Sequence, residues 1–323
     1  MKKHILTLKK CMNKVLITGG AGYLGSTLAE HLLDNGYAVT VLDNLTFKQL
    51  SLLHLFKREN FKFHLGDVRN TEFLLTLVKE HDVIIPLAAI VGMPACKANP
   101  ELAVDVNFKH IDNIVKVLRE NQKLIIPNTN SQYGSSNTII TEDSPFKPLS
   151  LYAKTKCDAE DSVLGNGNGI ALRLATVFGV SPRMRQDLLV NDFVYKSITD
   201  GYLVLFEAHF KRNYIHVQDI AQTFRFMIEN YDHCKGQAFN VGLSTANLSK
   251  LELAVKIKEH VPSLVIKQDD FKEDFDKRNY IVSNEKIENL GCSPKYDLDY
   301  GIEQLIEAYQ FVIPVNNRNF TNL

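Results

Sequence analysis

The chain has 323 residues, enough for one large domain or two smaller ones, and its 37 Lys and Arg residues balance its 37 Asp and Glu residues. A net charge of zero without runs of like charge argues against nucleic acid or another polyanion as a partner. The five cysteines form no CxxC pair and have no histidines at ligand spacing, so we expect no metal, no disulfide framework and a cytoplasmic location.

The first eleven residues surround a short apolar stretch with lysines. That stretch is too short for the core of a signal peptide, and we interpret residues 1–11 as a disordered extension. Met12 stands directly before the first predicted strand and is an alternative start of translation. No apolar stretch approaches the length of a membrane span, so we do not expect a membrane partner.

A glycine-dense turn, residues 19–25, follows an apolar segment and precedes a segment with helical spacing. A dinucleotide's pyrophosphate can rest against a helix N-terminus only where the backbone comes close, so the turn must lack Cβ atoms. Gly19, Gly22 and Gly25 meet this need. We therefore predict a cofactor site in this turn, which also includes Tyr23 and Leu24.

Asp43 ends a second apolar segment about twenty residues past these glycines. An acid at that distance can accept hydrogen bonds from both hydroxyls of the adenosine ribose. The alternative is an aspartate that simply starts a turn. In the first case Asp43 would repel a 2′-phosphate, for which only Lys48 offers a nearby counter-charge, so we expect NAD rather than NADP.

Short β-branched segments alternate with longer helical patterns through the first half of the chain, which is typical of a parallel sheet with βαβ crossovers. The expected strands are 14–18, 38–43, 62–65, 83–86, 123–127 and 170–174, and the expected long helices are 24–35, 102–120 and 151–164. After about Gly179 the pattern is irregular and indicates a smaller lobe. The fold predicted is a Rossmann-type α/β fold, a doubly wound parallel sheet with a smaller mixed α/β lobe.

Tyr152 and Lys156 form a Tyr-x-x-x-Lys pattern, which on a helix places both side chains on one face. General-base work at neutral pH needs the tyrosine pKa lowered by about three units from its usual value near 10. A neighbouring ammonium and the positive nicotinamide ring can supply this shift. The same spacing recurs at Tyr231 and Lys235, beside the end of a predicted helix, where we attribute it to chance.

A polar segment, residues 128–134, directly follows the predicted strand 123–127. In a parallel sheet this is the carboxyl edge, where ligands bind. The alternative is a plain turn before Gly134.

Several motifs now stand in an order that resembles the extended short-chain dehydrogenases/reductases, in their nucleotide-sugar epimerase/dehydratase branch. They are the glycine turn, Asp43, Gly66-Asp67-Val68, Leu87-Ala88-Ala89, Thr129 ahead of Tyr133-Gly134, and Tyr152 with Lys156. The resemblance covers nearly the whole chain from about Met12. It implies that Asp67 and Val68 contact the adenine, that Lys156 contacts the nicotinamide ribose, and that Thr129 contacts the hydroxyl to be oxidised. The cofactor contacts added on this basis are Asn44, Leu87, Ala88 and Ala89.

The resemblance implies that one part of the chain binds the cofactor and another part binds the substrate. Residues 12–180 are expected to form the NAD-binding domain, to which 214–242 return because 214–217 and 238–241 are strand-like. Residues 181–213 and 243–323 are expected to hold a nucleotide-diphospho-sugar. The implied substrate contacts are Thr129, Thr176, Arg183, Arg185, Asn191, Arg212 and Arg278, the arginines because a planar guanidinium can bind two phosphate oxygens. Relatives commonly dimerise through two helices, here 102–120 and 151–164, so we expect a homodimer; packing on the sheet explains their apolar stripes equally well.

Departures from the family pattern narrow the reaction. Relatives that eliminate water carry Asp and Glu directly after the threonine, where this chain has Asn130 and Ser131, which are poor acids and bases near neutral pH. Relatives that epimerise carbons 3 and 5 carry Cys at the position of Ser131. Thr176 stands where many relatives have an asparagine that contacts the sugar. These differences disfavour a 4,6-dehydratase and leave oxidation at carbon 4.

Two fates of the resulting 4-keto sugar remain open. A 4-dehydrogenase would release it, and a 4-epimerase would reduce it again on its other face. We favour the first, and the chain resembles the 4-dehydrogenases that act on GDP-linked manno-heptose in capsule synthesis. A non-catalytic NAD-binding regulator is a third interpretation, disfavoured because Thr129, Tyr152 and Lys156 are all present.

Overall fold

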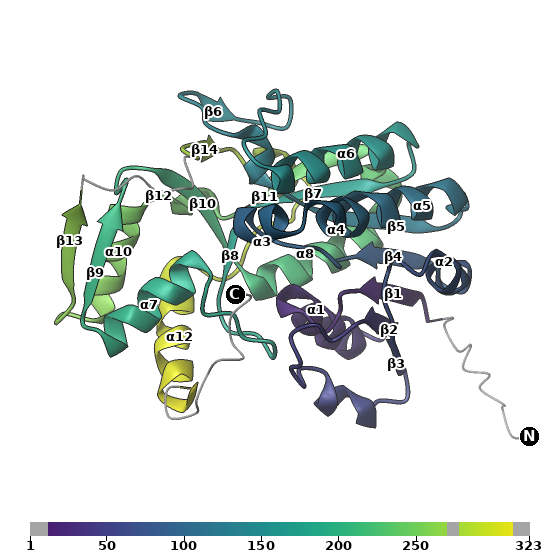
Figure 1. Cartoon of the computed structure of the whole chain (residues 1–323), viewed down its shortest axis with the longest axis horizontal. Coiled ribbons are helices and arrows are strands. Elements are labelled where there is room, and N and C mark those ends of the chain that lie inside the picture. The colour runs from purple at the N-terminus through teal and green to yellow at the C-terminus, as the bar shows by residue number, and fades with distance from the viewer. Residues whose placement is uncertain (1–11, 270–277, 313–323) are drawn as a thin grey trace, which may run out of the picture.

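The computed structural model describes residues 12–269 and 278–312, so the predicted extension 1–11 lies outside the described residues. A seven-stranded parallel sheet forms the centre of the molecule (Figure 1). Its strands are, in spatial order, β11 (Gln237–Val241), β7 (Ile170–Leu174), β5 (Lys123–Thr129), β4 (Val83–Pro86), β1 (Lys14–Thr18), β2 (Ala38–Asp43) and β3 (Phe61–Leu65). The order changes direction between β1 and β4, which is the place where doubly wound sheets bind ligands.

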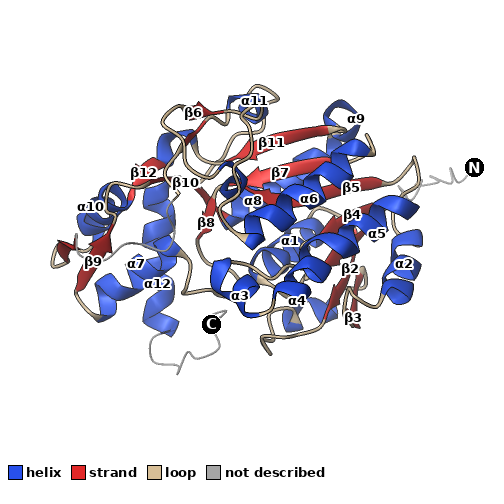
Figure 2. Cartoon of the chain, turned by 45° about the horizontal axis from the view of Figure 1, so that its top comes forward, coloured by secondary structure: helices blue, strands red, loops and turns tan. Residues whose placement is uncertain are grey.

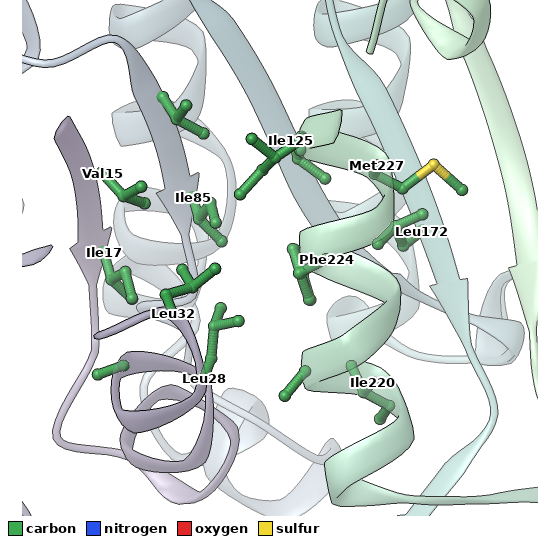
Figure 3. Close-up of a cluster of buried hydrophobic side chains, with 14 of the residues drawn as sticks. Val15, Ile17, Leu28, Leu32, Ile85, Ile125, Leu172, Ile220, Phe224 and Met227 are labelled. Carbon is green, nitrogen blue, oxygen red and sulfur yellow. The ribbon is translucent and has the colours of Figure 1, made fainter. Parts of the chain in front are cut away.

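Helices cover both faces of this sheet. On one face lie α1 (Tyr23–Asp34) and α8 (Val217–Glu229); on the other lie α2 (Thr71–Lys79), α5 (His110–Val117) and α6 (Leu151–Gly165). Successive strand residues point to opposite faces, so Val15 and Ile17 pack with α1 and α8 while Leu16 packs in the other layer. Figure 3 shows Leu32 of α1 and Phe224 of α8 in the first layer. All five residues are fully buried.

A smaller lobe lies beside one end of the sheet (Figure 2). Its strands are β8 (Thr176–Phe178), β10 (Lys211–His216) and β12 (Asn247–Ser249) in one sheet, β9 (Tyr202–Phe206) with β13 (Val265–Asp269) in a second, and β6 (Ile139–Ile140) with β14 (Ile281–Val282) in a third. Its long helices are α7 (Leu189–Thr199), α10 (Lys250–His260) and α12 (Leu298–Val312). Val194, Leu253 and Ile302, one from each helix, are fully buried in a core of their own.

The Rossmann-type fold predicted from the sequence is confirmed, and so are its six predicted strands, to within two residues at either end. The expectation that all of residues 214–242 return to the main sheet is wrong for the first strand. β10 pairs with β8 and β12 instead, while α8, the short helix Tyr231–Cys234 and β11 return. The physical reason is that β7 has β5 and β11 as its two neighbours, so the main sheet has no position beside it for β10.

The predicted helix 102–120 is interrupted. It consists of α4 (Pro100–Val104), a π-helical turn (Asp105–Lys109) and α5, and it follows the short helix α3 (Met93–Ala98). The turn places Asn107 in the interior, where its amide bonds both backbone groups of Ile90, at 2.8 and 3.0 Å, and Thr155 Oγ1 at 3.2 Å. The π turn thus ties the loop after β4 to α6.

The outward faces of α4, α5 and α6, all within the described residues, carry no exposed large apolar side chain. They carry ion pairs one helical turn apart, such as Lys116 with Asp112 and Lys154 with Asp158. The homodimer therefore stays a prediction. Among residues 12–269 and 278–312, none of the helices has both the length and the apolar character needed to cross a bilayer. Two short helices, α9 (Tyr231–Cys234) and α11 (Glu285–Glu288), complete the fold.

Candidate active site

A cleft of about 1040 Å³ opens at the carboxyl ends of the main-sheet strands. Its walls come from the loops after β1, β2, β3, β4, β5 and β8, from the first turns of α1 and α6, and from Arg278 and Tyr280. Most of the predicted site residues line it, namely Gly19, Gly22, Tyr23, Leu24, Asp43, Asn44, Asp67, Val68, Leu87, Ala88, Ala89, Thr129, Tyr152, Lys156, Thr176, Arg183, Arg185 and Arg278. The cleft therefore brings together residues that are far apart in the sequence.

The glycine turn forms a close-packed cradle at the start of α1. Gly19 has φ +68°, and a Cβ built on it would lie 2.6 Å from the backbone nitrogen of Ala88. A Cβ on Gly25 would lie 2.5 Å from the Gly19 carbonyl oxygen. Gly22 stands at the N-cap of α1, and no side chain caps that end. A bare helix N-terminus beside a backbone without Cβ atoms fits a pyrophosphate.

Asp43 is held in the cleft by backbone groups. Its carboxylate accepts hydrogen bonds from Ala21 N at 3.0 Å and from Leu45 N at 2.8 Å. Burial raises the pKa of this carboxyl, and the two backbone bonds oppose the rise. Asp67, the predicted adenine contact, is paired with Arg69, whose hydrogen bonds lower the Asp67 pKa to about 2. Both acids lie in the part of the cleft next to the glycine turn, which we call the cofactor half.

The predicted catalytic residues meet across β5 and α6. Ser150 caps α6 by accepting from Ala153 N at 3.2 Å, which sets the first turn that carries Tyr152. The Thr129 side chain lies close enough to the Tyr152 hydroxyl to lower its pKa against the effect of burial. Lys156, one turn along α6, is only 3 % exposed. The pattern found in the sequence therefore corresponds to one cluster in space.

Burial shifts the protonation of this cluster in opposite directions. It raises the pKa of Tyr152 to about 12, against the lowering effect of Arg278 and Arg185, and it lowers the pKa of Lys156 to about 8, against the raising effect of Glu160. Without a ligand the phenol is therefore protonated at neutral pH. Activation of Tyr152 needs further positive charge, which the oxidised nicotinamide carries.

Next to Thr129, Ser131 faces the cleft. The Thr129 hydroxyl donates to Ser131 Oγ at 2.9 Å, and Arg278 Nη1 donates to the same oxygen. Asn130 does not line the cleft: it is 1 % exposed, and among the described residues neither its amide oxygen nor its nitrogen has a hydrogen-bond partner. Of the two residues that replace an acid pair in the family pattern, only Ser131 reaches the site.

Arg183 and Arg185 lie in different surroundings. The Arg183 guanidinium stands 4.5 Å from the ring centroid of Phe47, and the charges of Arg185, Asp187 and, more weakly, Asp43 act on it. Burial is the main reason why the Arg183 pKa falls to about 10. Arg185 makes an ion pair with Asp187. Both arginines line the same cleft, and which of them contacts the substrate stays a prediction.

Two predicted substrate contacts, Asn191 and Arg212, are not among the cleft-lining residues. The Asn191 amide accepts from Gly179 N at 3.0 Å and donates to the Arg185 carbonyl at 2.7 Å. Arg212 lies 5.6 Å from the ring centroid of Tyr280 and donates to a backbone carbonyl. Both support loops that do line the cleft, and direct contact with substrate stays a prediction for them.

The sequence analysis missed two aromatic residues in the cleft wall, Phe47 and Tyr280. Phe47 is 44 % exposed, in the loop just after Asp43. Tyr280 follows Arg278 by two residues. The signal in the sequence was that each stands a few residues from a predicted ligand-binding residue, Phe47 from Asp43 and Tyr280 from Arg278. In the described part of the chain no three His, Cys, Asp or Glu side chains gather in a way that could hold a metal ion.

Comparison with known proteins agrees with this geometry. Residues 15–242 match the model of the NAD dependent epimerase/dehydratase family. The chain belongs to this family. Membership makes NAD the cofactor, and the glycine cradle and Asp43 fit it.

Three similar proteins illustrate the range of the family. A UDP-glucuronate 4-epimerase of Thermodesulfobacterium geofontis is 31% identical over 65% of this chain and 70% of its own length. The low-salt glycan biosynthesis protein Agl12 of Haloferax volcanii is 28% identical over 91% and 98%. The crystal structure of a UDP-glucuronic acid 4-epimerase from Bacillus cereus, with UDP-glucuronic acid and NAD, has a TM-score of 0.82 at 24% identity and covers 93% of this chain and 99% of its own. The last supports the fold.

Gly19→Ala should weaken NAD binding strongly, because the added Cβ would meet the Ala88 backbone in the cradle. The matched control is Gly36→Ala, which also has positive φ (+82°) but meets nothing within 4 Å. Both variants should lose about 1 kcal/mol of stability from backbone strain, and Gly19→Ala should lose more because its Cβ would also meet backbone atoms. Calorimetric titration with NAD should show a loss for Gly19→Ala alone, and equal affinities for the two variants would contradict the cradle.

Lys156→Met should be more stable than the parent protein at pH 7. A buried ammonium whose pKa falls from 10.5 to about 8 costs roughly 3 kcal/mol while it is charged. The parent regains this energy as pH rises from about 8 to 10.5, because the folded lysine loses its proton before the unfolded one. Urea unfolding across this range should show the difference shrinking. The exposed Lys154→Met should show no such gain, and a gain equal to that of Lys156→Met would contradict the interpretation.

Proposed function

We propose that this protein catalyses NAD-dependent oxidation of the carbon-4 hydroxyl of a nucleotide-diphospho-sugar. The observation that carries the proposal is the meeting of Thr129, Tyr152 and Lys156 in the same cleft as the glycine cradle and Asp43. A sugar hydroxyl held at Thr129, Tyr152 and Lys156 would lie in the same cleft as a cofactor held by the glycine cradle and Asp43.

The bound nicotinamide supplies the hydride acceptor. Tyr152, as phenolate, would remove the proton of the sugar hydroxyl, and the Thr129 hydroxyl, which lies beside the phenol, would hold the same oxygen. Lys156, through its positive charge one turn away, favours the phenolate. Lys156 is almost fully buried, so little water surrounds its charge.

The part of the cleft that Arg185 and Arg278 line, which we call the substrate half, offers cationic side chains for a diphosphate. Both arginines act electrostatically on the Tyr152 phenol. Guanidinium groups suit phosphate oxygens because they donate two parallel hydrogen bonds. The similar proteins whose names include a UDP-sugar support a nucleotide-sugar as the substrate class.

For the fate of the keto sugar we favour release, which makes the protein a 4-dehydrogenase, on a GDP-linked manno-heptose as the substrate implied by resemblance. The lack of an acid pair at Asn130 and Ser131 and the presence of Thr176 support an unusual sugar without a dehydration step. The second candidate is a 4-epimerase that recycles its NAD. It is favoured by the relatives named as 4-epimerases.

The direct test incubates the protein with excess NAD and each of several UDP- and GDP-sugars, a hexuronate and a heptose included, and follows products by mass spectrometry. Loss of two hydrogens with formation of NADH is expected for the dehydrogenase. An unchanged mass with a new retention time would establish the epimerase instead. Loss of water would overturn the argument from Asn130 and Ser131.

Tyr152→Phe should lower kcat by about a hundredfold or more, because the general base is lost, while NAD still binds. The matched control is Tyr231→Phe, which alters the second Tyr-x-x-x-Lys pattern. Tyr231 is buried and its hydroxyl accepts from Leu124 N at 2.8 Å, so its loss should cost about 1–2 kcal/mol of stability without changing kcat. Turnover by Tyr152→Phe near the parent rate would refute the mechanism.

A further inference from the structure

Asn128 lies between Thr129 on β5 and the turn of α6 that carries Lys156. Its side-chain oxygen accepts from the backbone N–H of Thr129, and its side-chain nitrogen donates to the backbone carbonyl of Lys156, both at 3.1 Å. One amide group therefore connects the end of β5 to the turn of α6 that carries the lysine. Asn128 is 3 % exposed, so water does not compete for these bonds.

A carboxylate fixes the direction of this amide. Glu160, four residues after Lys156 on α6, accepts from the Asn128 nitrogen with one oxygen. The same oxygen accepts from Gln132 Nε2 at 3.4 Å. An amide has a donating end and an accepting end, and an ionised carboxylate only accepts. Glu160 therefore holds the donating end of Asn128 toward α6.

Glu160 is itself held from the sheet. Its second oxygen accepts from Arg173 Nε at 3.0 Å and Nη2 at 2.6 Å, and both residues are almost fully buried. Arg173, on β7, also donates to the Tyr133 hydroxyl at 2.6 Å, and that hydroxyl donates to Asn240 at 2.7 Å. The charges are thus paired and their remaining hydrogen-bonding groups are used, which a buried ion pair requires.

We propose that Asn128 is a positioning residue that sets the separation between Thr129 on β5 and the Tyr152–Lys156 pair on α6, with Glu160 and Arg173 holding its amide in one direction. This inference rests on the proposed function, because the separation matters only if the three residues act on one hydroxyl. Displacement of a reacting group by about 1 Å can cost about a hundredfold in rate, whereas ground-state binding depends on the rest of the cleft.

The test compares Asn128→Ala with Asn284→Ala. Asn284 is also a fully buried asparagine, but it lies in the smaller lobe, where it donates to Asn213 and Ser244. Asn128→Ala should lower kcat at least about tenfold while KM and the Kd for NAD change less than about twofold. Asn284→Ala should lose stability without a change in kcat. A second variant, Asn128→Asp, keeps the acceptor for Thr129 but loses the donor for Lys156, and it should lower kcat as well.

Equal kcat values for Asn128→Ala, Asn128→Asp and the parent would overturn the inference, and so would a loss confined to KM. Hydrogen exchange separates this from a failure of the proposed function. The Thr129 amide should exchange faster in Asn128→Ala than in the parent, whether or not any nucleotide-sugar is turned over. If the parent oxidises none of the sugars, the proposed function falls; if the Thr129 amide exchanges unchanged, the positioning role falls.

Discussion

The ion pair between Glu160 and Arg173 is the interaction on which the catalytic end of the fold depends. It joins α6 to β7 in the interior, where either charge alone would be costly to bury. The same carboxylate opposes the effect of burial on the pKa of Lys156. One group therefore fixes α6 in place and helps to keep the lysine charged. Replacing the pair with apolar side chains could preserve the packing, but it would remove the charge that Lys156 needs and the acceptor that Asn128 uses.

The cleft concentrates features that lower stability. Gly19 takes a backbone conformation that other residues rarely adopt, Lys156 is a buried cation, and the Tyr152 phenol is desolvated. Such features persist only where the surrounding structure fixes them. Here the fixing comes from two apolar layers on either side of the parallel sheet, whose strands are buried along most of their length. Because the strand ends carry the functional loops, the same apolar packing that forms the core also sets the positions of the loops.

Some features of the fold and the site could be predicted from the sequence, and which ones depends on what each sequence pattern specifies physically. The main-sheet strands are continuous apolar segments, and the glycine turn has a steric meaning of its own, so both could be found without a structure. The strand-like pattern of β10 says that it is buried but not which sheet it joins, and its assignment to the main sheet was wrong. The π turn around Asn107 leaves the apolar spacing nearly unchanged. Phe47 is a loop residue outside any periodic pattern, so only the structure shows that its ring lies beside the Arg183 guanidinium.

Under the proposed reaction, chemistry at Tyr152 does not decide what becomes of the keto sugar. Elimination needs a proton acceptor beside Thr129, and the cleft offers the hydroxyl of Ser131 there, bonded by Arg278, while Asn130 lies outside it. The remaining fates are release and a turn of the sugar before a second reduction. A turn requires the nucleotide to stay bound while the sugar lets go of Thr129, whereas release requires the diphosphate contacts to weaken first. The balance therefore lies in the affinity of the substrate half of the cleft for the nucleotide, which Thr129, Tyr152 and Lys156 do not set.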